Sequence, residues 1–154
     1  GTINNLAGGV TVTIEDDFSK VDKTMKMGET IKLTDEQAVH FVHDRYYVGD
    51  ETNVQRMKRH EQYKEGLKKN LGEKCSEDNK YPLTIYDALG DYMVTDINSQ
   101  KFSKLALLVL KDKDAGTVSI DGTESVDDLG FVEVQPDEES LQKAILTLFY
   151  KEYK

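Results

Sequence analysis

Hydrophobic and polar positions near the start of the chain alternate as a β-strand requires. Val10, Val12 and Ile14 are separated by single threonines, so they fall on one face of an extended segment. The pattern predicts a strand over residues 10–14. A second short extended segment is predicted over residues 30–33.

A short helix is predicted directly after the second extended segment. Thr34 or Asp35 can cap it, and Gln37 lies three residues after Thr34, which indicates a partial capping box. The helix should end near Asp44.

The longest predicted helix begins after Thr52 or Asn53. Apolar and aromatic side chains then recur at steps of three and four, which is typical of one buried helical stripe. The members of this stripe are Val54, Met57, His60, Tyr63, Leu67 and Leu71. A polar loop is expected over residues 72–80.

The remaining pattern alternates between helices and strands. Pro82 suits the first turn of a helix, and Asn98 or Ser99 can cap the next one, which we expect to end near Leu107. The predicted strands cover residues 108–110, 117–120 and 131–134. The last predicted helix follows Pro136, and its expected buried face consists of Leu141, Ala144, Ile145, Leu148 and Phe149.

This interleaving predicts an α/β fold, with helices on both faces of a mixed central sheet, an α/β/α sandwich. The length of 154 residues suits a single domain over residues 1–154.

Composition narrows the function more than the fold. The net charge of −9 argues against general binding of nucleic acid. Cys75 is the only cysteine, so an internal disulfide or a cysteine metal cage is excluded. The sequence contains no run of 18 apolar residues that would predict a membrane span.

One stretch is basic in this acidic chain. Residues 52–71 contain six basic side chains against two acidic ones, a local charge of +4, and Arg45 lies just upstream. Arg56 and Arg59 are three residues apart on the predicted helix, so we expect their guanidinium groups to converge on one anion. The alternative is a basic helix face that is simply solvated.

Other chemistry has little support in the sequence. His40 and His43 could share a metal, but no acidic residue stands at a suitable spacing, and His60 falls on the apolar stripe. The acids around Gly116 lack the spacing of a calcium loop. Phosphate-binding glycine motifs and a nucleophile elbow are also missing from the sequence, so we predict no catalytic and no metal-binding residue in this chain.

Three motifs together resemble the LytR-CpsA-Psr (LCP) family. They are the segment L-A-G-G-V-T-V at residues 6–12, the segment F-V-H-D-R at 41–45, and the segment V-G-D-E-T-N-V-Q-R-M-K-R-H at 48–60. The ending F-V-E-V-Q-P-D-E-E-S-L-Q-K-A-I-L-T-L-F-Y fits as well. The resemblance implies a partial LCP domain, corresponding to its C-terminal portion without the N-terminal half.

The resemblance implies an activity in the bacterial cell envelope. Family members transfer glycopolymers, such as teichoic acid or capsule, from a polyprenyl-pyrophosphate carrier to peptidoglycan, with Mg²⁺. They lie on the extracellular face of the membrane, anchored by an N-terminal helix that this chain lacks. The older name of the domain is cell envelope-related transcriptional attenuator.

Individual roles follow by position in the motifs. Arg45 resembles the second arginine of R-x-R, and Arg56 and Arg59 resemble those of R-x-x-R-Q, which implies that all three bind the pyrophosphate. Arginine suits this role because its fork of donors matches phosphate oxygens.

Four supporting residues surround these arginines. Asp50 is the aspartate nearest to Asn53 in the sequence. Three departures from the family pattern are His43 for arginine, Asn53 for an acid, and His60 for glutamine. The acids that hold Mg²⁺ in the family precede the G-G-V strand, so we expect no magnesium site in this chain alone. The full-length protein is expected to be a phosphotransferase and this chain alone to be inactive.

Two alternatives stay open. The chain could bind an envelope glycolipid without chemistry, or its basic helix could dock an acidic protein partner. Half of an α/β domain also leaves a sheet edge uncovered, which predicts a homodimer or strand exchange.

Overall fold

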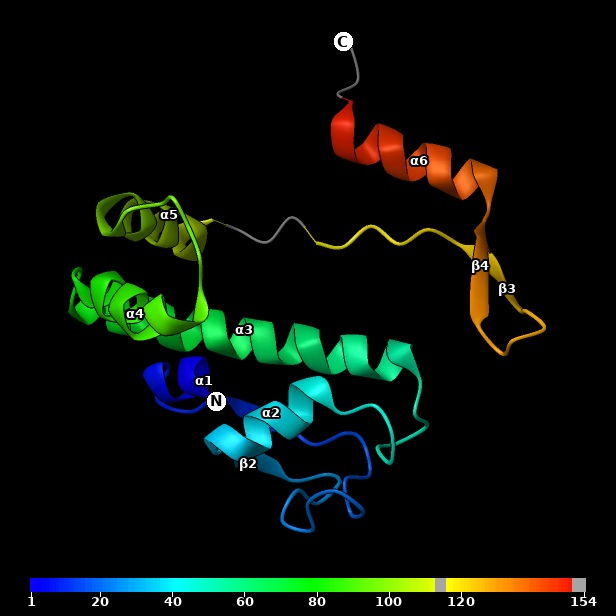
Figure 1. The fold of residues 1–154 in the computed structure, drawn as a ribbon, viewed down its shortest axis with the longest axis horizontal. Helices are drawn as coiled ribbons and strands as arrows, with labels where there is room; N and C mark the ends of the chain where they lie inside the picture. Colours follow the sequence, from blue (N-terminus) through cyan, green and yellow to red (C-terminus); the bar gives the residue numbers. More distant parts are fainter. Residues whose placement is uncertain (113–115, 151–154) are drawn as a thin grey trace. The chain divides into compact units, whose positions relative to one another are not determined.

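The computed structural model describes residues 1–112 and 116–150 (Figure 1). The chain forms two compact units, Gly1–Asp112 and Lys113–Lys154. Unit 1 contains α1 (Thr2–Leu6), β1 (Thr11–Thr13), β2 (Thr30–Lys32), α2 (Asp35–His43), α3 (Asn53–Glu77), α4 (Tyr81–Leu89), the 3₁₀ turn η1 (Gly90–Tyr92) and α5 (Ser99–Lys111). Unit 2 contains β3 (Gly122–Val126), β4 (Val132–Pro136) and α6 (Glu138–Phe149).

Helix α3 is the central element of unit 1. It packs against β1 and α2 on one side and against α4 and α5 on the other (Figure 1). Its contact with β1 is close because Gly66 has no side chain, and a Cβ there would lie 2.6 Å from Val10 Cγ1.

The core of unit 1 gathers around the strand pair. Strands β1 and β2 are antiparallel, with Val12 opposite Ile31. The alternation predicted for residues 10–14 is confirmed, since all three apolar members are buried. The core cluster consists of Ala7, Val10, Val12, Ile14, Phe18, Met25, Leu33, Ala38, Phe41 and Val48.

The start of α2 forms as predicted. The Thr34 hydroxyl accepts a hydrogen bond from the Gln37 backbone N–H, and the Gln37 side chain accepts one from the Thr34 N–H, so the capping box is complete. Ala38 and Phe41 are the buried residues on the inner face of the helix.

Helix α3 is longer than predicted, and its buried stripe is shifted. It continues to Glu77, so the predicted loop over 72–80 is wrong for its first six residues. The helix continues because Leu71 and Cys75 extend its inward face. Met57 and His60 are exposed, and the inward position of that turn belongs to Arg59, which is 5% exposed.

The apolar run in α5 is helical throughout. Helix α5 is capped by Asn98 as predicted but ends at Lys111, so the strand predicted over 108–110 is wrong. The periodicity of so short an apolar run does not show whether it forms a strand or a helix. Leu108 and Val109 are exposed.

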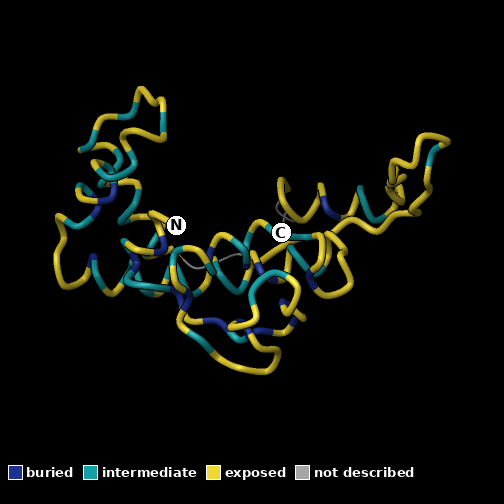
Figure 2. The backbone as a smooth tube through the Cα atoms, turned by 60° about the horizontal axis from the view of Figure 1, so that its bottom comes forward, coloured by how far each residue is buried: buried dark blue, intermediate teal, exposed yellow. Residues whose placement is uncertain are grey.

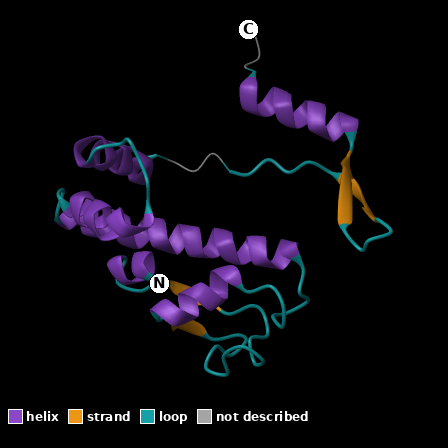
Figure 3. Ribbon diagram, viewed as in Figure 1, coloured by secondary structure: helices purple, strands orange, loops and turns teal. Residues whose placement is uncertain are grey.

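Unit 2 is a hairpin followed by a helix (Figure 3). Strands β3 and β4 pair antiparallel with Glu124 opposite Val134, which confirms the strand predicted over 131–134 to within two residues. The strand predicted over 117–120 is wrong, because β3 begins at Gly122. Ala144 is buried on α6, whereas the other apolar residues of its predicted face are exposed or half-buried (Figure 2).

The predicted α/β class is confirmed, with helices accompanying short antiparallel strand pairs. In residues 1–112 and 116–150, the strands form two separate two-stranded sheets, in place of the single mixed central sheet of the predicted sandwich. Assignment of residues 1–154 to one domain stays a prediction.

Candidate anion site at the start of α3

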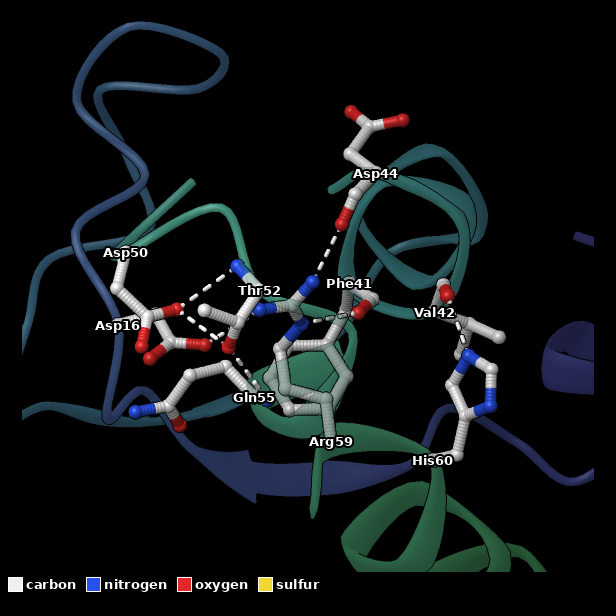
Figure 4. Close-up of polar contacts among 9 residues, drawn as sticks. All are labelled: Asp16, Phe41, Val42, Asp44, Asp50, Thr52, Gln55, Arg59 and His60. Carbon is white, nitrogen blue, oxygen red and sulfur yellow. Dashed lines mark hydrogen bonds and ion pairs between the residues drawn. The ribbon is translucent and has the colours of Figure 1, made fainter. Parts of the chain in front are cut away.

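The start of α3 is fixed by a small network of polar contacts (Figure 4). Thr52 caps the helix, and its hydroxyl accepts a hydrogen bond from the Gln55 N–H at 3.2 Å. Asp50 accepts hydrogen bonds from the Thr52 N–H at 2.9 Å and from the Thr52 hydroxyl at 2.8 Å. These bonds from Thr52 to the carboxylate lower the pKa of Asp50.

Arg59 lies in the second turn of α3 and points inward (Figure 4). Its Nε donates to the Phe41 carbonyl at 2.8 Å, its Nη1 donates to Asp16 Oδ2 at 2.5 Å, and its Nη2 donates to the Asp44 carbonyl. The side chains of Arg59 and Asp16 are 5% and 7% exposed. All three guanidinium nitrogens are therefore engaged within the chain.

The three histidines lie around the C-terminal end of α2. His60 Nε2 donates to the Val42 carbonyl at 2.6 Å. His40 Nδ1 lies 2.7 Å from Asp44 Oδ2, and His43 Nδ1 lies 3.7 Å from Asp44 Oδ1. His43 thus lies beside the carboxylate of the adjacent Asp44.

Arg56 is partly buried in the first turn of α3. Its Nη2 donates to Asn53 Oδ1 at 2.7 Å. Its Nε is shielded from solvent and has no hydrogen-bond partner among the described residues. A buried donor in this state is costly unless another acceptor meets it.

Arg45 lies in the loop between α2 and α3. Its Nη2 donates to the Tyr46 hydroxyl at 2.6 Å, and its guanidinium carbon lies 4.6 Å from the centre of the Tyr46 ring. This arrangement leaves the guanidinium at the surface.

The structure brings only part of the predicted set together. Arg56 and Asn53 bond to each other, and Asp50 orders the cap in front of them. The expected convergence of Arg56 and Arg59 is wrong, because Arg59 turns toward Asp16 and α2 while Arg56 turns back toward Asn53.

Asp16 is the residue that the sequence did not single out. It follows the alternating strand, where an acid is ordinarily a turn residue. The burial of Asp16 depends on its pairing with Arg59, which lies far away in the sequence. Both residues line a hollow of about 260 Å³ that also involves Glu15, Lys58 and Gln62.

The described residues do not form a magnesium site. No three His, Cys, Asp or Glu side chains of residues 1–112 and 116–150 gather as metal ligands. Asp16 pairs with Arg59, so its carboxylate does not fit the role of an open Mg²⁺ ligand.

The described helices are also too short or too polar to cross a bilayer.

Comparison with known proteins identifies the family. No curated protein matches the chain. Similar solved structures include the Lin1025 protein from Listeria innocua, with 22% identity and a TM-score of 0.59 over 95% of this chain and 60% of that protein. They also include a transcriptional regulator from Enterococcus faecalis, with 21% identity and a TM-score of 0.69 over 99% of this chain and 56% of that protein. The chain therefore spans about three-fifths of the length of these relatives. The family model matches residues 2–148, and the chain belongs to the LytR_cpsA_psr family.

Proposed function

We propose that this chain is part of a cell-wall glycopolymer phosphotransferase and that it binds the pyrophosphate of a polyprenyl-linked polymer. Membership of the LytR_cpsA_psr family supports a cell-wall glycopolymer-related role. The acceptor would be peptidoglycan, and the polymer would be of the teichoic acid or capsule type. The site would lie on the extracellular face of the bacterial membrane.

The observation that carries the proposal is the state of Arg56. Its Nε is buried and unpartnered among the described residues, next to an Asn53 that already holds its Nη2. A turn of the Arg56 side chain would expose this donor, and a phosphate oxygen would then satisfy it with a charge-assisted hydrogen bond. Arg45, which is held at the surface by Tyr46, would supply a second guanidinium.

Mg²⁺ belongs to the proposal only for the full-length domain. Because the described residues do not offer an open set of ligands, no step of the reaction is assigned to them through the metal. This chain would contribute binding and orientation of the diphosphate, and it would be inactive alone.

The direct test measures binding of farnesyl pyrophosphate, as a short polyprenyl pyrophosphate, to the chain by calorimetry. Arg56→Ala should weaken binding by about tenfold or more, since a charge-assisted hydrogen bond is lost. Lys58→Ala is the matched control. Lys58 is exposed and lies two residues after Arg56, so its replacement also removes one positive charge from the same helix. Equal affinity of Arg56→Ala and wild type would contradict the proposal.

A second candidate function is docking of an acidic protein partner by the basic face of α3. Lys58 and Lys69 are exposed on this helix, which favours a diffuse charge over a shaped site. Arg56→Lys separates the two functions. A diffuse surface tolerates the exchange, whereas a forked diphosphate contact loses geometry.

A homodimer is a separate part of the proposal. Apolar side chains such as Val126, Phe131 and Val132 are more than 60% exposed in unit 2, and contiguous exposed apolar surface is typical of interaction sites. Sedimentation of the purified chain tests this directly, and a monomer at all concentrations would contradict it.

A further inference from the structure

We infer that Arg59 is a positioning residue and not a ligand-binding one: with Asp16 it forms a clamp that holds the loop carrying Arg45 and Asp50 against α3. The inference rests on the proposed diphosphate site, and it assigns to Arg59 a different role from the pyrophosphate binding that the family resemblance implies.

The Arg59 guanidinium is fully engaged within the chain. Nε, Nη1 and Nη2 each donate within the chain, to Phe41, Asp16 and Asp44. Its face also lies over the Phe18 ring, with 5.4 Å between the guanidinium carbon and the ring centre. A diphosphate could engage this group only by displacing contacts that are already satisfied.

Arg59 and Asp16 form a buried ion pair. Both side chains of the ion pair are less than a tenth exposed. Charges in such a place are tolerated when they are paired and hydrogen-bonded, and breaking the pair leaves an uncompensated charge. The pair therefore offers a ligand little surface, although both residues line a hollow.

The clamp joins three segments of unit 1. Asp16 belongs to the segment after β1, Phe41 and Asp44 belong to the end of α2, and Arg59 belongs to α3. Helix α2 leaves its last carbonyls without partners in its own helix. Two of these oxygens accept hydrogen bonds from α3: the Phe41 carbonyl from Arg59, and the Val42 carbonyl from His60.

The loop after α2 is tied to the same clamp. The Gly49 N–H donates to the Asp17 carbonyl at 3.1 Å, and Val48 is buried in the core. A Cβ at Gly49 would lie 3.1 Å from Asp16 Oδ1. The loop therefore packs directly on the carboxylate that holds Arg59, and its position depends on that carboxylate.

The two roles of Arg59 predict opposite effects for Asp16→Asn. If Arg59 bound the diphosphate, loss of a nearby negative charge would free the guanidinium and strengthen anion binding. If Arg59 positions the loop, the same change weakens the clamp and thereby the binding, although it removes a negative charge. Glu15→Gln is the matched control, because Glu15 is an exposed acid beside Asp16 and its loss leaves the clamp intact.

The experiment measures inorganic pyrophosphate and farnesyl pyrophosphate binding to wild type, Asp16→Asn and Glu15→Gln, together with amide hydrogen exchange of residues 44–52. We expect Asp16→Asn to weaken both ligands by about tenfold, from loss of a buried charged hydrogen bond, and to accelerate exchange in the loop. Glu15→Gln should leave the exchange unchanged and should not weaken binding. Stronger binding by Asp16→Asn, with an unchanged loop, would overturn the inference.

Arg59→Lys keeps the experiment decisive if Asp16→Asn does not fold. Lysine retains the charge but cannot serve three acceptors at once, so we expect the loop to exchange faster. A protected loop in Arg59→Lys would overturn the clamp. If wild type binds neither ligand, the proposed function fails, whereas the clamp is still judged on the exchange of the loop in these variants.

Discussion

Both units of the chain contain an antiparallel strand pair and a capped helix, yet only one of them encloses a core. In unit 1, Phe18 and Phe41 are at most 1% exposed. In unit 2, all ten residues of β3 and β4 are exposed, and Ala144 is the buried residue of α6. Local turn and cap residues are therefore enough to form helices and strands in both units. Burial of their apolar side chains also requires a second layer to pack against.

The largest expected effect comes from truncating one phenylalanine in each unit. Phe41→Ala removes a ring from the core of unit 1 and should lower the free energy of unfolding by about 3–5 kcal/mol. Phe131→Ala removes a ring that is 66% exposed and should change it by no more than about 0.5 kcal/mol. Urea denaturation followed by circular dichroism measures both. A large loss in Phe131→Ala would show that unit 2 is covered in solution.

A second comparison uses two glycines of the same helix. Gly66→Ala would place a Cβ 2.6 Å from Val10 Cγ1, so we expect a loss of about 1–3 kcal/mol from overpacking. Gly72→Ala meets no atom within 4 Å and should gain up to about 1 kcal/mol, because alanine favours a helix. Thermal unfolding of the two variants checks the opposite signs, and a shared sign would contradict the close contact of α3 with β1.

Helix caps should contribute alike in both units, since they depend only on local geometry. Thr34→Ala removes the hydroxyl that accepts from Gln37 and should destabilise unit 1 by about 1 kcal/mol. Asp137→Ala removes the acceptor of the Ser140 N–H in α6. Its expected result is a loss of helicity at the start of α6, measured by backbone chemical shifts, with unit 1 unchanged. Loss of unit 1 stability in Asp137→Ala would show that the units unfold together.

The sequence predicted what short-range chemistry determines. The caps Thr34, Thr52 and Asn98 and the buried alternation from Val10 to Ile14 were all predictable, because each depends on residues a few positions apart. The family was also recognisable from three short motifs, and the family model confirms it.

Features that depend on distant residues were less predictable. Arg59 falls on a polar position by sequence, and its burial depends on Asp16, which is 43 residues away. The strand expected over 108–110 instead continues α5, because the periodicity of a short apolar run does not separate a strand from a helix. A local sequence pattern therefore could not distinguish the buried Arg59 from an arginine on a solvated helix face.

The smallest expected effect is a dependence of stability on pH. It measures how much the local cap at the start of α3 adds to the stability that the core gives unit 1. The bonds from Thr52 hold the pKa of Asp50 below its usual range, so its ionised form is favoured by folding. Its contribution to stability is present at neutral pH and is lost as the pH falls below about 4, through the lowered pKa. Asp50→Asn lacks this contribution at every pH. The urea midpoints of wild type and Asp50→Asn should therefore differ slightly at pH 7 and converge in acid. The control Glu73→Gln changes an exposed acid within α3 and should show no such convergence. A gap that widens in acid would contradict the assignment of Asp50 as an ionised cap support.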